Sequence, residues 1–533
     1  MVSNTKKPCF LGSVILKQQE TTSDKDSLRT VIDGQQRLTT LNIFLKVLCL
    51  KKNADSDFTE TFKKQRDKSI ILLHNHNDQK SFNKVVNLET LEVFNEISEN
   101  DNILLAYKFF CENITDDDSL DFFNILDNIL FVGIDLGSKE DEQQIFDTIN
   151  SLGVRLTTAE LLKNYFFNRN EVENYHKYWK HIFEKDEETR IYWDKEITTG
   201  RSKRTFIDLF FYSYLQIKIQ EPELKVKTED KINFSIVDSL FESYKKFIKD
   251  YKLNKSEILD EIKEYALLFK ENFSYEIVGS ELTSESGVGR VNAIIFGLDT
   301  STLIPYVLYI LKNVNDENQR NNLFEFIESY VMRRIVVKAT TKNYNQLFTD
   351  RLISNRVLSK EQFSNFLESR ADKVNFVPSD AELEQGFLNS VLINKQAAGI
   401  IYLIESKIRN RHKQATQLLG INKYSLEHLM PKKWENKWPI ATTTAVKEFK
   451  DNRNFRLKTL GNLAIITQSL NTSIRNADWI TKKQGNGKNA GLIHYSGGIE
   501  TLAPYLETNE WNEVTIEERA NFLYSKAKEI WRY

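Results

Sequence analysis

Glycine and proline are scarce in this sequence, with 19 and 7 among 533 residues. Both lie well below their usual shares of about 7% and about 5%. So few turn-forming residues favour long helices and argue against a β-sandwich, a propeller or a collagen-like repeat. The three cysteines, Cys9, Cys49 and Cys111, are far apart and form no CxxC pair. This spacing excludes a zinc knuckle and a disulfide framework, and it favours reduced thiols in a cytosolic protein.

Long apolar runs are also missing, and no secretory leader is expected from the N-terminal residues of this sequence. No stretch of about 18 uncharged apolar residues occurs, so no membrane span is expected. The short apolar run at 10–16 lacks a small-residue cleavage site. We therefore expect a cytoplasmic protein that does not contact a membrane. The apolar fraction of 41% excludes a disordered chain, and the length predicts two to four domains of about 100–200 residues each.

The whole chain has a net charge of only −2, but the charges are unevenly distributed along it. Residues 395–488 contain 18 basic and 6 acidic residues, a net charge of +12, whereas residues 1–394 carry −11 and residues 489–533 carry −3. Such a basic block is expected where a protein binds a phosphate backbone, although a solvated basic surface is the alternative. The candidate DNA-binding residues are Lys407, Arg409, Arg411, Lys413, Lys432 and Lys433. The aromatic residues among them are Trp434, Trp438 and Phe455.

The pattern of apolar residues predicts a mixed α+β fold that is mostly α-helical. Strands are predicted at 9–16, 27–32 and 129–136, and a helix at 38–50. Residues 170–410 are almost entirely helical in pattern, with amphipathic stretches at 204–220, 234–251, 321–337 and 386–409. Within them, Arg333 and Arg334 are predicted either to contact DNA phosphate or to lie on a solvated helix face.

A group of polar residues marks the C-terminal part, where the predicted order is strand, loop, strand and helix over 424–483. Glu427 and His428 end the first strand, Asn462 starts the second, and Asn471 lies at the entry of the helix. A strand pair crossed by a helix can bring these four residues together. A structural histidine at a strand end is the alternative.

These residue types fit the hydrolysis of a phosphodiester. A neutral imidazole at His428 can act as general base on water. Glu427 and the amide oxygen of Asn471 can hold a hard divalent cation that stabilises charge on the phosphate. Asn462 can orient the histidine, because a base needs its second ring nitrogen fixed. One carboxylate and one amide form a weak cage, which suits Mg²⁺ or, as an alternative, Mn²⁺.

A second motif lies near the N-terminus, where Asp33, Gly34, Gln35, Gln36 and Arg37 follow a predicted strand and open a helix. Glycine at such a turn allows a close backbone approach, and the start of a helix presents free N–H groups to an anion. Arginine in the first turn can bind phosphate through two hydrogen bonds. The motif predicts a nucleotide site, with a capped helix and a surface arginine as the alternative.

The C-terminal motifs resemble a known family. The string from Glu427 to Pro431, followed by Leu460-Gly461-Asn462-Leu463 and Asn471, is similar to the HNH (ββα-metal) nuclease domain of GmrSD-type restriction endonucleases, which are type IV and modification-dependent. The family's ending is matched at Lys482, Trp511, Ile516, Arg519 and Trp531. The resemblance implies His428 as general base, Asn462 as the middle residue, and Glu427 with Asn471 at the metal. Many HNH nucleases carry Asp and His where this chain has Glu427 and Asn471.

The N-terminal motif resembles the same family. Asp33 to Arg37, followed by Leu-Thr-Thr-Leu, is similar to the signature of its ParB-like, sulfiredoxin-fold domain, and residues 146–164 match a second family pattern. The resemblance implies binding and hydrolysis of a nucleoside triphosphate (GTP, ATP or CTP), with Asn150 and Lys163 lining the pocket or serving as cap and surface residues. Family members usually carry several tens of residues before the first strand, so we expect a truncated N-terminal domain or a misplaced start.

These observations predict three domains: a ParB-like nucleotide-binding domain at 1–168, a helical connector at 169–394 and an HNH endonuclease domain at 395–533. The expected function is metal-dependent cleavage of DNA by an anti-phage defence enzyme, under nucleotide control and directed at modified or foreign DNA. Two alternatives stay open: a nucleotide-responsive DNA-binding regulator without cleavage, and an HNH nuclease that acts on RNA. The oligomeric state, including a homodimer, also stays open.

Overall fold

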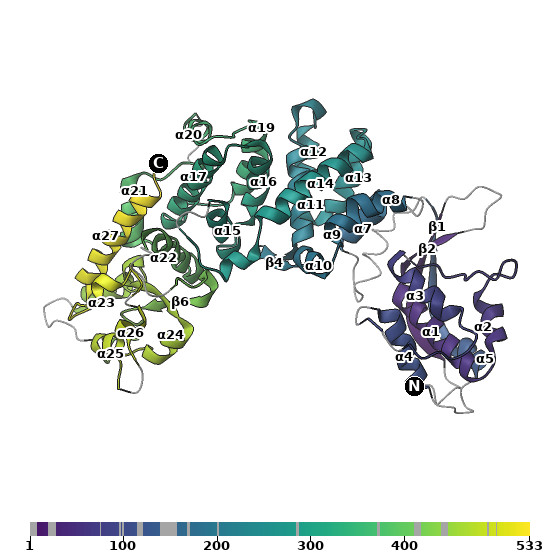
Figure 1. The fold of residues 1–533 in the computed structure, drawn as a ribbon. Coiled ribbons are helices and arrows are strands. Elements are labelled where there is room, and N and C mark those ends of the chain that lie inside the picture. Colours follow the sequence, from purple (N-terminus) through teal and green to yellow (C-terminus); the bar gives the residue numbers. More distant parts are fainter. Residues whose placement is uncertain are drawn as a thin grey trace. The chain divides into compact units, whose positions relative to one another are not determined.

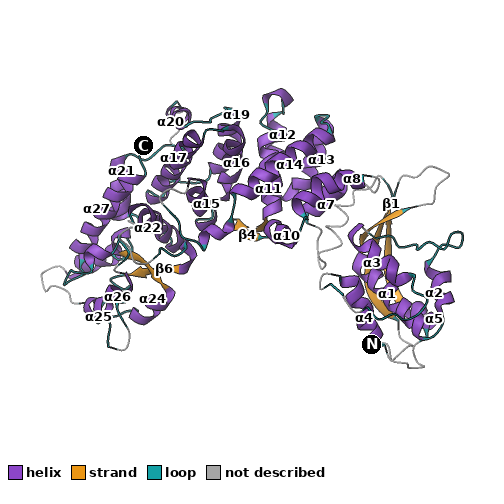
Figure 2. Ribbon diagram, in the orientation of Figure 1, coloured by secondary structure: helices purple, strands orange, loops and turns teal. Residues whose placement is uncertain are grey.

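The computed structural model describes residues 8–533 except 20–27, 75, 95–96, 99–100, 115–120, 139–156, 168–170, 200–201, 284–286, 370–373, 410–416, 439–445, 488–489 and 497. The described residues are mostly helical and contain three small sheets (Figure 1, Figure 2), which confirms the mostly α-helical α+β prediction. The chain divides into two compact units, Met1–Leu156 and Thr157–Tyr533. No helix in the described part is both long and apolar enough to cross a membrane.

The first unit contains a three-stranded sheet of order β2-β1-β3, and all three predicted strands are confirmed. Strand β1 (Cys9–Gln18) lies in the middle, antiparallel to β2 (Arg29–Asp33) and parallel to β3 (Ile129–Leu136). The Arg29 guanidinium on β2 reaches across β1 to the carboxylate of Asp135 on β3, with an N–O distance of 2.8 Å. This ion pair therefore joins the two outer strands of the sheet.

The helices described in the first unit share one apolar core, which includes Leu48, Phe58, Phe82 and Tyr107. The predicted helix at 38–50 is confirmed, and it begins earlier, directly after Gly34. The helices are α1 (Gln35–Lys51), α2 (Asp55–Phe62), α3 (His76–Val86), α4 (Asn102–Asn113) and α5 (Phe122–Asn128).

The second unit opens with a long helical region, as its sequence pattern predicts. Its first part consists of α7 (Thr158–Phe166), α8 (Val172–Tyr175), α9 (His181–Phe183), α10 (Glu187–Trp193), α11 (Phe206–Lys218), α12 (Thr228–Phe234), α13 (Leu240–Asp250), α14 (Lys255–Asn272) and the strand pair β4 (Glu196–Thr199) and β5 (Ser202–Thr205). It continues with α15 (Gly287–Gly297), α16 (Ile304–Asn313), α17 (Glu317–Val336), α18 (Tyr344–Gln346), α19 (Leu352–Ser354), α20 (Lys360–Glu368), α21 (Asp380–Asn389) and α22 (Asn394–Ile408).

The C-terminal part of this unit contains a third, two-stranded sheet between helices. Strand β6 (Tyr424–His428) pairs antiparallel with β7 (Leu463–Thr467), so the predicted strand–loop–strand–helix order is confirmed. The helix predicted over 470–483 is interrupted: it is two helices, and Arg475 between them has a positive φ of 34°. The helices are α23 (Val446–Arg456), α24 (Gln468–Ile474), α25 (Trp479–Gln484), α26 (Leu492–Ser496) and α27 (Glu513–Ile530).

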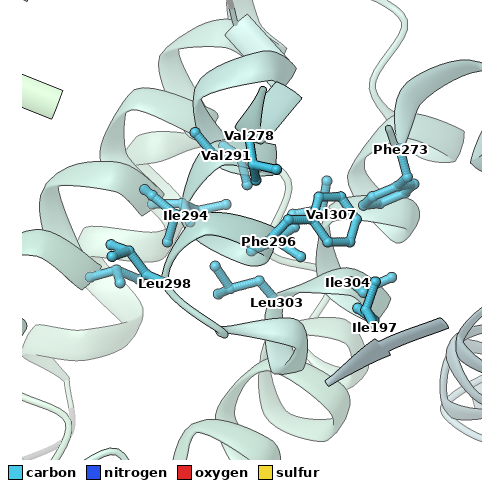
Figure 3. Close-up of a cluster of buried hydrophobic side chains, with 14 of the residues drawn as sticks. Ile197, Phe273, Val278, Val291, Ile294, Phe296, Leu298, Leu303, Ile304 and Val307 are labelled. Atoms are coloured by element: carbon cyan, nitrogen blue, oxygen red, sulfur yellow. The ribbon is translucent and has the colours of Figure 1, made fainter. Parts of the chain in front are cut away.

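One buried apolar cluster runs through the second unit, from Ala159 to Trp531. Figure 3 shows the part of it built around α15, where Val291, Ile294 and Phe296 pack with side chains from neighbouring segments. Polar contacts also join the middle helices to the end of the chain. Glu328 on α17 forms an ion pair with Arg290 at 2.6 Å and accepts a hydrogen bond from the indole of Trp531 at 3.0 Å.

Arg333 and Arg334 on α17 do not lie on a solvated face, so both alternatives proposed for them from the sequence are wrong. Each side chain is only 1% exposed. Arg333 bonds to Asp380 and to the main-chain oxygens of Pro378 and Trp531. Arg334 donates to the main-chain oxygens of Thr340 and Phe376. Buried guanidinium groups are tolerated here because carbonyl and carboxylate oxygens surround them.

Candidate functional site

His428 is the last residue of β6, opposite Leu463 at the start of β7. Its imidazole is half-buried, and neither ring nitrogen has a hydrogen-bond partner among the described residues. Burial, together with the positive charges of Lys432 and Lys482, lowers the pKa of His428 to about 4. The ring is therefore neutral at physiological pH, which is the protonation state that a general base needs.

Asn471 lies on α24, the helix that directly follows β7, and it contacts β6. Its amide nitrogen donates to the hydroxyl of Ser425 at 3.0 Å and to the main-chain oxygen of Leu426 at 3.4 Å. The two bonds fix the orientation of the amide. Its Oδ1 accepts no hydrogen bond from the described part of the chain, so this oxygen is available to a ligand.

Glu427 is held by a lysine. Its carboxylate is 8% exposed and forms an ion pair with the fully buried ammonium of Lys482 on α25. The same ammonium donates to the main-chain oxygen of His428 at 2.8 Å. Burial raises the pKa of Glu427 and lowers that of Lys482, while the attraction between them opposes both shifts. The Glu427 carboxylate is therefore already bound by a positive charge.

Asn462 is fully buried and does not orient the ring of His428, which corrects the expectation from the sequence. Its Oδ1 accepts from the Met430 amide at 2.8 Å and from the Trp511 indole at 3.0 Å. Its amide nitrogen donates to the main-chain oxygens of Met430 and Leu457, both at 2.9 Å. With both lone pairs and both protons used, Asn462 fixes the main chain two residues beyond His428.

The turn that carries Asn462 is held by α27. Arg519 is fully buried, and it donates to the main-chain oxygens of Gly461 at 2.8 Å and Leu463 at 2.7 Å. A Cβ at Gly461 would lie 2.0 Å from the main-chain oxygen of Ile516 on α27. Only glycine permits this close approach, so the Leu-Gly-Asn-Leu string serves to seat Asn462 under the end of β6.

Asn471 and Glu427 carry the kind of oxygen that a hard cation takes as a ligand. Asn471 offers a free amide oxygen, and Glu427 offers a carboxylate that is shared with Lys482. Carboxylate and amide oxygens are typical ligands of Mg²⁺, which keeps several waters. In the described residues no group of three or more His, Cys, Asp or Glu gathers at one place. The divalent cation therefore stays a prediction, with Asn471 and Glu427 as its candidate ligands.

The basic block is partly buried. Lys432 and Lys433 are exposed directly after the end of β6. Lys407 forms an ion pair with Glu325 at 3.3 Å. Arg409 is 9% exposed and donates to the main-chain oxygen of Gly498, so its assignment as a DNA contact is wrong. Arg411 and Lys413 lie outside the described residues. Trp434 and Trp438 are core residues, 1% and 6% exposed, whereas Phe455 is exposed.

In the first unit, the string from Asp33 to Arg37 forms the turn between β2 and α1. Gly34 has φ 95°, and α1 starts there without a side-chain cap. Arg37 pairs with Asp33 at 2.7 Å and donates to the main-chain oxygen of Leu11 at 3.1 Å, which leaves further guanidinium donors. Gln35 and Gln36 are exposed. A turn with a free helix start and an arginine can bind an anion.

Two residues beside this turn were not predicted from the sequence. Gly12 on β1 has φ 101°, and a Cβ there would lie 2.3 Å from Nη1 of Arg37. His74 contacts the hydroxyl of Thr39 through Nε2 at 2.7 Å and stacks on Phe82. A lone histidine in a loop gives no sequence signal for such a contact. Asn150 lies outside the described residues, and Lys163, in the second unit, forms an ion pair with Glu184 at 3.1 Å.

Comparison with known proteins assigns the chain to a class of enzyme. The model of the GmrSD restriction endonuclease N-terminal domain matches residues 2–167, and the model of the GmrSD restriction endonuclease C-terminal domain matches residues 377–526. Both matched segments are therefore those of a restriction endonuclease, a nuclease whose substrate is DNA. Because the two matches cover more than half of the chain, this protein belongs to the GmrSD restriction endonuclease family. No curated protein matches the chain.

Proposed function

We propose that this endonuclease is an HNH-type phosphodiesterase whose active site lies at the end of β6, and that it depends on a divalent metal ion. The observation that carries the proposal is the geometry around His428. The strand ends on a neutral imidazole that has no hydrogen-bond partner among the described residues. Asn471, whose Oδ1 accepts no hydrogen bond from those residues, belongs to the helix packed on that strand, and Lys432 and Lys433 are exposed beyond the strand end.

Each residue at the end of β6 has its own role in the proposed reaction. Lys432 and Lys433 attract the phosphate backbone, and His428 takes a proton from the attacking water. Asn471 and Glu427 would hold Mg²⁺ or Mn²⁺, which when bound supplies positive charge to the scissile phosphate and the leaving oxygen. Asn462 touches no substrate in this scheme. It fixes the peptide after His428 and is a positioning residue rather than a catalytic one.

The N-terminal unit supports a second part of the proposal, nucleotide control. The turn from Asp33 to Arg37 combines a helix start that has no side-chain cap with an arginine whose Nη1 and Nη2 each make one hydrogen bond to the described residues. Such a turn favours a phosphate group. We assign it the binding and hydrolysis of GTP, ATP or CTP, which would license cleavage of modified or foreign phage DNA. The alternative proposals are a regulator that binds DNA without cleaving it, and cleavage of RNA.

The deciding experiment is a plasmid-cleavage assay of the full chain with Mg²⁺ or Mn²⁺, using His428→Ala beside the wild type. Loss of a general base lowers rates by about 10²–10⁴-fold. We expect such a fall with unchanged DNA affinity and unchanged tryptophan fluorescence. Cleavage at the wild-type rate by His428→Ala would overturn the HNH assignment. The same assay compares the cleavage of unmodified, glucosylated and methylated DNA and of RNA of the same sequence. Each substrate is tested with and without each nucleotide.

A further inference from the structure

The ammonium of Lys482 lies where α25 meets the end of β6. Lys482 is fully buried, and the helix that carries it is fixed at its start by Asp478, whose side chain accepts from the Thr481 amide at 2.9 Å. The ammonium contacts the carboxylate of Glu427 and donates to the main-chain oxygen of His428 at 2.8 Å. Lys482 therefore binds two successive residues of β6: the side chain of Glu427 and the main-chain oxygen of His428.

The two residues after His428 are bound by Asn462. The Leu429 amide donates to the main-chain oxygen of Asn462 at 2.9 Å, and the side chain of Asn462 forms two hydrogen bonds to Met430. The main-chain groups of His428 and Met430 are thus bound by the buried side chains of Lys482 and Asn462, and the Leu429 amide is bound by the Asn462 main chain. Lys482 comes from α25 and Asn462 from the turn before β7. His428, whose ring is half-buried, is the first residue of this fixed stretch.

Stability alone is a weak reason to bury this lysine. Removing an ammonium from water is costly, and a buried ion pair often stabilises the fold no more than an apolar pair of the same size. A buried ion pair does fix geometry, because each charge loses its stabilising partner if the two groups move apart. Because Lys482 also donates to the main-chain oxygen of His428, the geometry that this pair fixes is that of the end of β6.

We propose that Lys482 is a positioning residue for His428, which it holds through the Glu427 carboxylate and the His428 main-chain oxygen. This inference rests on the proposed function, in which His428 is the general base. Lys482 touches no substrate; it sets the place of the imidazole at the end of β6. Misplacement of a catalytic group by about 1 Å can cost about 100-fold in rate, and loss of a supporting residue typically costs about 10- to 100-fold.

The neighbouring lysine is a matched control. Lys483 is also buried, on the same helix, and donates to the main-chain oxygen of Thr508 at 2.8 Å, away from β6. We expect Lys482→Met to lower kcat by about 10- to 100-fold with KM for DNA changed by less than about twofold. Lys483→Met is expected to keep kcat. Lys482→Arg, which retains the charge, is expected to recover part of the kcat that Lys482→Met loses.

A second readout does not need activity. In metal-free protein labelled with ¹³C at histidine rings, the His428 signal, assigned by its loss in His428→Ala, is expected to shift in Lys482→Met and not in Lys483→Met. An unchanged signal together with an unchanged kcat would overturn the inference. A shifted signal in a chain whose His428→Ala variant still cleaves DNA would uphold the positioning and overturn the proposed function instead.

Folding is tested in the same variants. If Lys482→Met does not fold, Lys482→Arg is compared with Lys483→Arg at equal unfolding midpoints. The inference is supported if kcat falls and the His428 signal shifts in Lys482→Arg but not in Lys483→Arg, because Lys482 contacts β6 and Lys483 contacts Thr508 instead. Equal kcat values and equal signals in the two arginine variants overturn it.

Discussion

Asn462 and Met430 exchange two hydrogen bonds: the Met430 amide donates to Oδ1 at 2.8 Å, and Nδ2 donates to the Met430 oxygen at 2.9 Å. Asn462→Ala would leave these two groups, the Leu457 oxygen and the Trp511 indole buried and unpaired. Each such loss costs about 1–3 kcal/mol, so we expect a loss of about 3–5 kcal/mol in the free energy of unfolding.

The measurement is urea unfolding followed by tryptophan fluorescence. All seven tryptophans lie in residues 157–533, so their fluorescence reports on the unit that contains Asn462. Asn471→Ala is the matched control, because Asn471 is half-buried and its removal frees only Ser425 and Leu426. We expect Asn471→Ala to unfold near the wild-type midpoint while DNA cleavage falls. Equal midpoints for the two variants would contradict the structural role of Asn462.

The guanidinium of Arg37 occupies the space that a side chain at Gly12 would need. Alanine at position 12 would place a Cβ 2.3 Å from Nη1 of Arg37, at a φ of 101° that alanine rarely adopts. If Arg37 binds phosphate, Gly12→Ala should weaken nucleotide binding about 10- to 100-fold, as Arg37→Ala should, because one charge-assisted hydrogen bond contributes about 1.5–3 kcal/mol.

Fluorescent analogues of GTP, ATP and CTP measure this affinity by anisotropy. Gly133→Ala on β3 is the control, since a Cβ there meets no atom within 4 Å. We expect Gly133→Ala to bind nucleotide as the wild type does. Wild-type affinity in Gly12→Ala would remove the nucleotide assignment from this turn.

Lys432 and Lys433 are exposed shortly after His428 and are candidate phosphate contacts that are accessible in the described part of the chain. The double variant Lys432→Ala/Lys433→Ala should weaken DNA binding and flatten its dependence on salt. Each lost phosphate contact lowers the slope of log K against log salt by about 0.9. Binding is measured by anisotropy in EDTA at several salt concentrations.

Lys342→Ala, an exposed lysine outside residues 395–488, serves as the control for charge. It should leave both the affinity and the slope unchanged. The unfolding midpoint should also stay constant in all these variants, because exposed lysines contribute little to stability. A slope that is unchanged in the double variant would exclude the two lysines from the DNA surface.

Asp380 gives a pH-dependent prediction. Its hydrogen bond to Arg333, at 2.6 Å, and then its bond to Lys528 hold the pKa of Asp380 below its ordinary 3.8. A lowered folded-state pKa means that the charged carboxylate stabilises the fold. This contribution is complete above pH 3.8 and is lost as the pH falls through the folded-state pKa.

Asp380→Asn should therefore unfold at lower urea than the wild type at pH 7, and the two should converge in strong acid. Tryptophan fluorescence between pH 7 and pH 2.5 measures the difference. Asp451→Asn, at an exposed position on α23, is the control and should follow the wild type throughout. A difference between Asp380→Asn and wild type that persists unchanged in strong acid would exclude the carboxylate as its source.

Much of the local structure could be predicted because it follows from short-range patterns. The three strands of the first unit, the helix after Gly34 and the strand–loop–strand–helix order near His428 each follow from apolar spacing and turn residues. Long-range contacts could not be predicted in this way. Arg333 is buried because Pro378 and Trp531, far along the chain, place main-chain oxygens around it.

The candidate site shows the same division. The sequence by itself determined which residues surround the strand end, since Glu427 and His428 are adjacent and Asn462 and Asn471 flank the next strand. Only the tertiary structure decided what each does. Asn462 is saturated by the Met430 and Leu457 peptides and by Trp511, and Lys482 reaches Glu427 across 55 positions of chain. Hydrogen bonds are satisfied by whatever packing brings near, and a linear pattern does not contain that information.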